Sequence, residues 1–244
     1  MQTNKKNVSL LWIGTVSVLL FTVMSSNPVS TLAAYADSNY QSSMTQIKSC
    51  SGKPSSNTDW SNCDLHGTSL EFLNLTGINL SGANLQGANL YGTNLSGANL
   101  VGAQLTGASL NNVNLSGAKL NGINAQNMDF YHADLAGADL QGANLAGSSF
   151  GVASFQNADL SGANLSWVRV IQVSFAGTNL SKADLSNANL RTSDLTGANL
   201  SGANLDSADG SYAILAGADL TGANVSGFAT AGTDRSCHGS PICH

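Results

Sequence analysis

A five-residue phrase is repeated through most of this chain, and its period limits the fold more than any other feature. From Cys63 to Gly227 the sequence reads, without insertion or deletion, as 33 blocks: a small residue, Asn or Asp, Leu, and two variable positions. The third position is Leu 25 times and Phe four times, and the first position is Ala 20 times. Neither position ever holds a charged residue, so both are predicted to face away from water.

A period of five matches neither a helix nor a simple alternating strand. A helix with this period would spread its apolar residues around the whole cylinder, and its frequent Gly, Asn and Asp would weaken it. Short extended pieces joined by turns fit better. Two inward residues flank one outward residue, and the last two turn a corner, where Gly is frequent at the fifth position. Repetition at a fixed period therefore predicts a solenoid whose coils bury a common axis.

Blocks such as ANLQG at residues 83–87 and ANLSG at residues 198–202 resemble the pentapeptide-repeat family, whose motif is A(D/N)LxX. The resemblance implies an all-β fold, a right-handed quadrilateral β-helix with four blocks in each coil. The 33 blocks then give about eight coils and a rod roughly 40 Å long at a strand spacing of ~4.8 Å. Two pairs of aromatic residues, Phe130 with Phe150 and Phe155 with Phe175, are 20 residues apart. They are expected to stack inside such a rod.

The chain is predicted to divide into four parts. Residues 1–36 form a signal peptide, 37–62 an N-terminal cap or linker, 63–227 the repeat β-helix, and 228–244 a C-terminal tail with a cysteine pair. Within residues 37–62, the helix-like spacing of apolar residues over 39–49 predicts a short capping helix. Open ends of a solenoid need such covers, because their strand edges are otherwise unpaired.

The first 36 residues have the organisation of a secretory signal peptide. Lys5 and Lys6 precede an apolar run at residues 8–24, and small residues precede Asp37, which predicts cleavage after Ala36, or alternatively after Ala33. An uncleaved anchor is the other interpretation, since a run of this length is near the lower limit of a membrane span. We expect an exported protein, in the periplasm, outside the cell, or in the thylakoid lumen if the source is cyanobacterial. Membrane association is expected only if the segment is not cleaved.

Four cysteines flank the repeats, Cys50 and Cys63 before them and Cys237 and Cys243 after them. Export permits disulfides, and four cysteines allow three connectivities. Two local pairs, Cys50–Cys63 and Cys237–Cys243, are favoured because a rod between the ends keeps the other partners apart. The segment from Lys48 to Cys50 that leads to Cys63 also resembles the N-terminal start of exported cyanobacterial members of the family.

Two alternatives for these cysteines remain open. Cys63 occupies a first position and could be a buried free thiol. Cys237, His238, Cys243 and His244 could together bind zinc, although adjacent Cys-His pairs are awkward for one tetrahedral ion. A disulfide is favoured over metal at this end, so no metal and no cofactor are predicted.

Catalysis is not predicted. The sequence GSSFG at residues 147–151 formally matches a nucleophile elbow, but that motif has meaning only on a strand-to-helix turn with triad partners. Here it lies within the repeat, with Phe150 as a predicted core residue. A solenoid with a filled core offers no substrate pocket. We therefore expect a protein that is not an enzyme and binds no small-molecule substrate.

The charge distribution narrows the choice of partner. Residues 37–244 carry all 14 acidic and seven of the nine basic residues, a net charge of −7, which argues against binding nucleic acid or an anionic membrane. The resemblance also brings an alternative function, because the family includes cytoplasmic members that mimic DNA and protect topoisomerases from quinolones. That function calls for a dense acidic surface, whereas only nine of the 33 second positions are Asp.

One predicted face of the rod differs from the other three. With four blocks in a coil, Gly fills the fifth position in seven of eight blocks on each of two faces, in five of nine on a third, and once on the fourth. Exposed aromatic and basic residues on and beside this fourth face suggest an interaction surface for an unknown protein partner. We call it the strip; its predicted residues are Tyr91, Tyr131, His132, Trp167, Arg169, Ile171 and Arg191. The alternative is that this corner only uses a turn type that needs no Gly.

Overall fold

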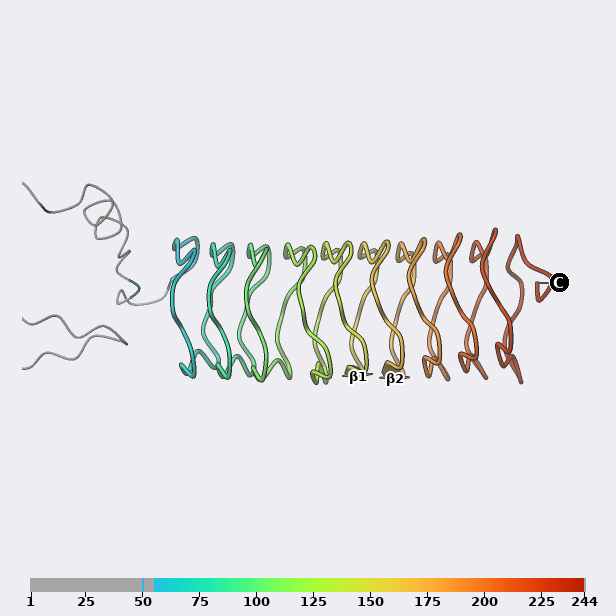
Figure 1. Ribbon diagram of the computed structural model, residues 1–244, viewed down its shortest axis with the longest axis horizontal. Helices are drawn as coiled ribbons and strands as arrows, with labels where there is room; N and C mark the ends of the chain where they lie inside the picture. The colour runs from blue at the N-terminus through green and yellow to red at the C-terminus, as the bar shows by residue number, and fades with distance from the viewer. Residues whose placement is uncertain (1–49, 51–54, 244) are drawn as a thin grey trace, which may run out of the picture. The chain divides into compact units, whose positions relative to one another are not determined.

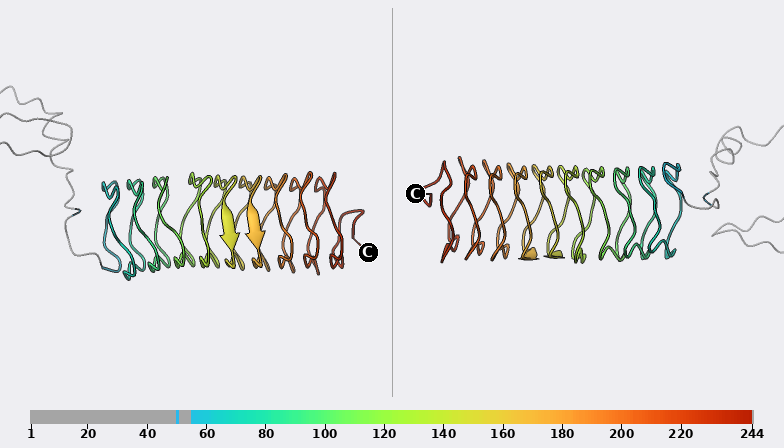
Figure 2. Two further views of the ribbon diagram at one scale, coloured as in Figure 1. Left: turned by 90° about the horizontal axis from the view of Figure 1, so that it is seen from below. Right: turned by 180° about the vertical axis from the view of Figure 1, so that it is seen from behind.

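The computed structural model of the chain describes Cys50 and residues 55–243 (Figure 1). These residues form coils stacked along one axis, as the views in Figure 2 show from two further directions. The described residues contain two regular strands, β1 (Ser149–Gly151) and β2 (Arg169–Ile171), which pair in parallel with Phe150 opposite Val170. The predicted signal peptide and the predicted helix at 39–49 lie outside the described residues. In the part that is described, no helix has both the length and the apolar character needed to cross a membrane.

The coils are held together by a ladder of parallel bridges between second-position residues. Each bridge joins residues 20 apart, from Asp59–Asn79 to Ile214–Asp234, and a last bridge joins Asp219 to His238. This register confirms the predicted coil of 20 residues. Among the described residues the ladder is interrupted at one place, where the bridges Gln104–Asn124 and Ser109–Asp129 are missing.

The ladder extends beyond the predicted range of 63–227 at both ends. Trp60, only 3% exposed, occupies the third position of one more block before Cys63, a position where the sequence pattern had Leu and Phe. At the other end, Asp234 and His238 still form bridges. Residues 55–62 therefore belong to the solenoid, and so does the first part of the predicted tail, because backbone pairing tolerates side chains that break the motif.

The first and third positions of the blocks form the core, as predicted. Leu140 is fully buried and Ala138 is 1% exposed, and burying each Leu contributes about 1.5–3 kcal/mol. A missing side chain in one coil is also compensated by a large side chain in a neighbouring coil. The ring of Phe228 fills the space beside Gly210 that a side chain at that third position would need.

The phenylalanines stack as their spacing predicted. The ring centroids of Phe130 and Phe150 are 4.9 Å apart, and those of Phe155 and Phe175 are 5.1 Å apart. An edge contact of 5.0 Å between Phe150 and Phe155 joins the two pairs. Such aromatic pairs add about 0.5–1.5 kcal/mol beyond the area that they bury.

The preference for Asn and Asp at the second position has a local cause. Its side-chain oxygen accepts a hydrogen bond from the backbone N–H two residues later, as between Tyr91 and Asn89 at 3.1 Å, which stabilises the turn at the corner. In several coils the Asn amide also donates to the second-position side-chain oxygen one coil earlier, as from Asn99 to Asn79 at 3.3 Å. One Asn side chain can thus form hydrogen bonds both within its own corner and with the neighbouring coil.

Two disulfides close the ends of the described region. Cys50 is bonded to Cys63, 13 residues away, and Cys237 to Cys243, six residues away. The local pairing is therefore confirmed. The alternatives of a buried free thiol at Cys63 and of zinc at Cys237 and Cys243 are wrong, because each of these sulfur atoms is used in a disulfide.

Candidate functional site

Every corner of the solenoid is built with the same backbone conformation. From residue 57 to residue 232, each fifth-position residue has a positive φ, between +54° and +73°. This left-handed region suits Gly and is tolerated by Asn, whereas other residues occupy it at a cost of about 1–2 kcal/mol. The alternative explanation for the strip, a corner that uses a turn without this requirement, is therefore wrong.

Corner residues that are 20 positions apart lie in successive coils and form a column. The residues that bear this cost are concentrated in one such column. Among the described fifth positions with positive φ, nine are neither Gly nor Asn. Six of them share the column of Phe72: Phe72, His132, Val152, Gln172, Thr192 and Tyr212. The other three, Trp167, Lys182 and Ser207, are divided between two further columns. The fold does not require side chains in the column of Phe72, because Gly92 makes the same corner there.

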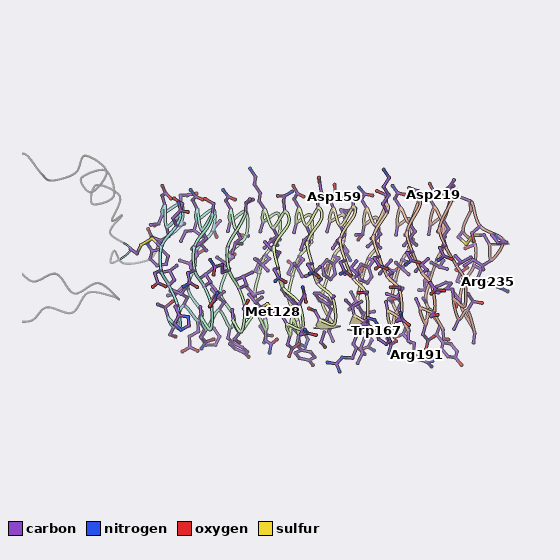
Figure 3. All side chains as sticks on the ribbon, in the orientation of Figure 1. Met128, Asp159, Trp167, Arg191, Asp219 and Arg235 are labelled. Carbon is purple, nitrogen blue, oxygen red and sulfur yellow. A yellow bond between two sulfur atoms is a disulfide. The ribbon has the colours of Figure 1, made fainter. Side chains whose placement is uncertain are left out.

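The predicted strip residues are all exposed. The exposed fractions are 47% for Tyr131, 65% for Trp167 and 62% for Ile171, and Arg169, His132, Tyr91 and Arg191 are also open to solvent. Figure 3 shows Trp167 and Arg191 projecting from the same lower side of the coils, whereas Asp159 and Asp219 lie along the upper side. Strand β2 places Arg169 and Ile171 on one short extended segment.

The contacts divide the strip into three groups along the rod. Near the N-terminal end, the ring of Tyr91 packs edge-on against Phe72 at 5.4 Å. In the middle, Tyr131 and His132 form an edge contact at 4.3 Å. Towards the C-terminal end, Arg191 forms a 3.1 Å ion pair with Asp209 and lies 5.6 Å from the ring centroid of Tyr212.

Glycines in the following coil make room for the strip's aromatic rings. A Cβ placed on Gly151 would lie 2.6 Å from Tyr131 Cδ2, and one placed on Gly92 would lie 2.7 Å from Phe72 Cδ1. The ring of Tyr212 covers Gly232 in the same way. Each ring therefore rests on bare backbone, which restricts its motion while leaving it exposed.

Three exposed residues in the same columns, Phe72, Val152 and Tyr212, were not among the predicted strip residues. They are 70%, 42% and 58% exposed and have the left-handed conformation described above. All three lie in the column of the Gly-poor face, so the absence of Gly at the fifth position already located them in the sequence.

Three carboxylates of the described surface have a lowered pKa because neighbouring residues donate hydrogen bonds to them. The pKa of Asp209 lies below its ordinary value of 3.8, mainly because the Ser211 side chain donates a hydrogen bond to the carboxylate, with further help from Arg191. The pKa of Asp219 and that of Asp234 are lowered by hydrogen bonds from Thr221 and Ser236 respectively. Over Cys50 and residues 55–243, no group of three or more His, Cys, Asp or Glu is arranged to hold a metal ion.

Solved structures with the same repeat are similar to this chain. One is HetL, a pentapeptide repeat protein involved in heterocyst differentiation regulation from the cyanobacterium Nostoc sp. strain PCC 7120. It is 27% identical, with 77% of this chain and 88% of that chain covered and a TM-score of 0.42. Another is QnrB1, a plasmid-mediated fluoroquinolone resistance protein, at 20% identity, with 70% and 90% covered and a TM-score of 0.35.

A third similar structure is a pentapeptide repeat protein from the Arabidopsis thaliana thylakoid lumen. It is 32% identical, with 46% of this chain and 65% of that chain covered and a TM-score of 0.15. No curated protein sequence matches the chain significantly.

The repeat itself is decisive for classification. A family model described as pentapeptide repeats matches residues 56–82, 74–112, 108–145, 133–170, 153–197 and 193–227. Together these segments cover more than half of the chain and follow the same five-residue frame as the bridges and the left-handed corners. The family implies a right-handed β-helix, and the chain belongs to the pentapeptide-repeat family.

Proposed function

We propose that this protein is an exported, non-enzymatic repeat scaffold that presents the strip, together with the adjoining column of Phe72, to a protein partner. The observation that carries the proposal is the column of left-handed corners occupied by Phe72, His132, Val152, Gln172, Thr192 and Tyr212. Each costs about 1–2 kcal/mol that Gly would avoid. Strain of this kind, kept on one side of a regular scaffold, favours a role for the side chains beyond folding.

The chemistry of the strip supports a protein partner. Aromatic and Arg side chains are enriched at protein interfaces and commonly dominate their binding energy, at about 2 kcal/mol or more for each anchor. Rings held over Gly92 and Gly151 lose little conformational entropy on binding, because the scaffold already restricts them. Pentapeptide-repeat proteins are also generally non-catalytic.

Export rests on separate support. The two disulfides fit an oxidising compartment, and the organisation of residues 1–36 is typical of a signal peptide. We place the protein in the periplasm, outside the cell, or in a thylakoid lumen. We also propose a four-sided rod with about eight coils between residues 63 and 227; four left-handed corners in each 20-residue register support the number of sides.

Cross-linking in the exporting cell tests the function. The variant Tyr131→Ser, Trp167→Ser, Ile171→Ser should lose its cross-linked partner while retaining the melting temperature of the wild type, because all three side chains are largely exposed. The control carries Thr76→Ala, Ser96→Ala and Ser116→Ala on the neighbouring face and should keep the partner. Equal recovery of the partner with both triple variants would show that the strip is not the binding surface.

A further inference from the structure

The interruption of the bridge ladder leaves two rows of backbone groups facing each other without hydrogen bonds. We call it the open interval, defined by residues 101–110 on one edge and 121–130 on the other. In intact coils, a third-position N–H donates to the next coil, as Leu85 does to Gln104, and the second-position N–H donates back, as Gln104 does to Ala83. Across the open interval, none of the corresponding bonds is formed within the described residues.

The unpaired groups are numerous and ordered. The N–H groups of Gly102, Leu105, Gly107 and Leu110 and the C=O groups of Ala103 and Ala108 line the first edge. The C=O groups of Asn121, Asn124, Gln126 and Asp129 and the N–H groups of Asn124 and Asp129 line the second. None of them has a hydrogen-bond partner among the described residues. Donors and acceptors therefore recur along each edge as they do at the edge of a parallel sheet.

The opening is a wedge and not a complete break. The bridges Asn99–Lys119 and Asn114–Asp134, on either side of it, are intact, so the two coils remain hinged together. Figure 1 shows the wider separation of the coils at this point, and Figure 3 places Met128 beside it. A cavity of about 360 Å³ lies there, lined by Gln86, Gly102, Ala103, Gln104, Thr106, Gly122, Ile123 and Asn124.

Side chains in and beside the second edge depart from the common pattern of the blocks. Ile123 and Met128 occupy first positions, where most blocks have Ala, and Ala125 replaces Leu at a third position. At the corner between them, the Ser148 hydroxyl is inserted into the turn. It accepts from Met128 N–H at 3.1 Å and donates to Ala125 C=O at 2.7 Å. This block therefore has a different shape from the Ala-and-Leu blocks on which close stacking depends.

We propose that the open interval binds a short extended polypeptide segment of a partner by strand addition. An extended backbone is the ligand whose alternating N–H and C=O groups complement the partial charges of either edge, as in other cases of β-augmentation. Small apolar side chains fit the floor, where Ala103 and Ile123 lie. A phosphate would satisfy only the donors and leave the carbonyl groups unpaired.

Geometry limits the length of the segment. Each edge turns a corner at residues 106–107 or 126–127, with a positive φ at Gly107 and at Asn127. A straight segment can therefore pair along only one side of a coil, and the cavity of about 360 Å³ accommodates a few residues. The inference deepens the proposed function, a protein partner, but it rests on residues that the strip does not contain.

The test uses the peptide acetyl-Ser-Val-Ser-Val-amide and a version methylated at each backbone nitrogen. NMR of the labelled protein should show at least tenfold slower hydrogen exchange at Leu105 or Asn124, according to the edge used, with the first peptide. The methylated peptide should have no effect, because its methyl groups remove the backbone donors and prevent its backbone from lying close to a strand edge. Equal effects of both peptides, or no effect of either at saturating concentration, would overturn the proposal.

A second arm closes the wedge. The variant Ile123→Ala, Ala125→Leu, Met128→Ala restores the Ala and Leu residues that most blocks have at these positions. It should protect the amides of Leu105 and Asn124 from exchange without peptide, and it should abolish peptide binding. Ile78→Ala, at a fully buried first position beside an intact bridge, is the matched control and should leave peptide binding unchanged. Undiminished binding by the closed variant would contradict the proposal. The triple Ser variant of the strip should still bind the peptide, so failure of the strip and failure of the interval are distinguishable.

Discussion

The ring of Tyr131 lies over Gly151, one coil further along the solenoid, where an added Cβ would be 2.6 Å from Tyr131 Cδ2. Gly151 does not have the left-handed backbone of the corners, so space for the ring is the feature that a larger residue would remove. The exposed ring is thus fixed by a contact between residues 20 positions apart, which is the register of the bridges.

Gly151→Ala should therefore displace the Tyr131 ring with little effect on folding. The ring is at the end of a side chain that can rotate away, so we expect a loss of stability below about 1 kcal/mol. The aromatic NMR signals of Tyr131 and His132 should shift. In a Tyr131→Ala background the same substitution should have no effect on the His132 signals; an identical shift there would contradict the contact.

The core positions are predicted to be intolerant of charge. Leu140→Asp should cost about 4 kcal/mol or more, because the carboxylate would be buried without a partner. Asn99→Asp, at an outward second position, should change stability by less than about 1.5 kcal/mol, since the side-chain oxygen that accepts from Val101 N–H at 3.2 Å is retained and only the 3.3 Å hydrogen bond from its amide to Asn79 is lost. Chemical denaturation measures both values, and equal midpoints would refute the assignment of inward and outward positions.

Two substitutions at the left-handed corners are predicted to change the stability of the protein in opposite directions. Val152→Gly should stabilise the protein by about 0.5–1 kcal/mol, because relief of the β-branched side chain at φ +58° exceeds the entropy that Gly adds to the unfolded chain. Gly137→Ala, at φ +65° with open space around the new methyl group, should destabilise it by about 1 kcal/mol. Thermal unfolding compares the two. A loss of stability in Val152→Gly would show that this corner is not strained.

The carboxylates near the C-terminal end predict a dependence on pH. Hydrogen bonds from Thr221 and Ser236 lower the folded-state pKa of Asp219 and that of Asp234 below the ordinary 3.8. Their stabilisation is therefore complete above that value and is lost as the pH falls through the lowered pKa of each group. The melting temperature should drop over this acidic range, and Thr221→Ala with Ser236→Ala should reduce the drop. An unchanged pH profile in the double variant would count against this cause.

The disulfides predict a redox effect at the ends. Reduction should open the loop between Cys50 and Cys63, which are 13 residues apart. The expected loss of folding stability is about 3 kcal/mol from the entropy that the unfolded chain regains. Cys237 and Cys243 close a shorter loop of six residues, so their loss should cost less. Mass spectrometry of unreduced peptides identifies the pairs, and melting of Cys50→Ser and Cys243→Ser variants ranks them. A larger loss from Cys243→Ser would contradict the ranking.

Much of the architecture follows from the sequence by itself. The five-residue period is a local signal repeated 33 times, so inward positions, corner positions and the stacking of Phe130 on Phe150 could all be predicted by counting. Sorting the fifth positions by face also located the strip. The cysteine pairs could be predicted because only neighbours in the chain can meet at the two ends of a rod.

The tertiary structure decided the properties that depend on contacts between coils. Whether Val152 lies in a relaxed or a strained corner depends on a backbone angle that stacking imposes, and the sequence had left both possibilities open. The opening beside Met128 lies at a coil in which Ile123, Ala125 and the Ser148 hydroxyl depart from the common pattern. Its consequence, a row of unpaired groups from Gly102 to Leu110, appears only when that coil is placed against its neighbour, because hydrogen bonds between residues 20 apart leave no mark on the local pattern.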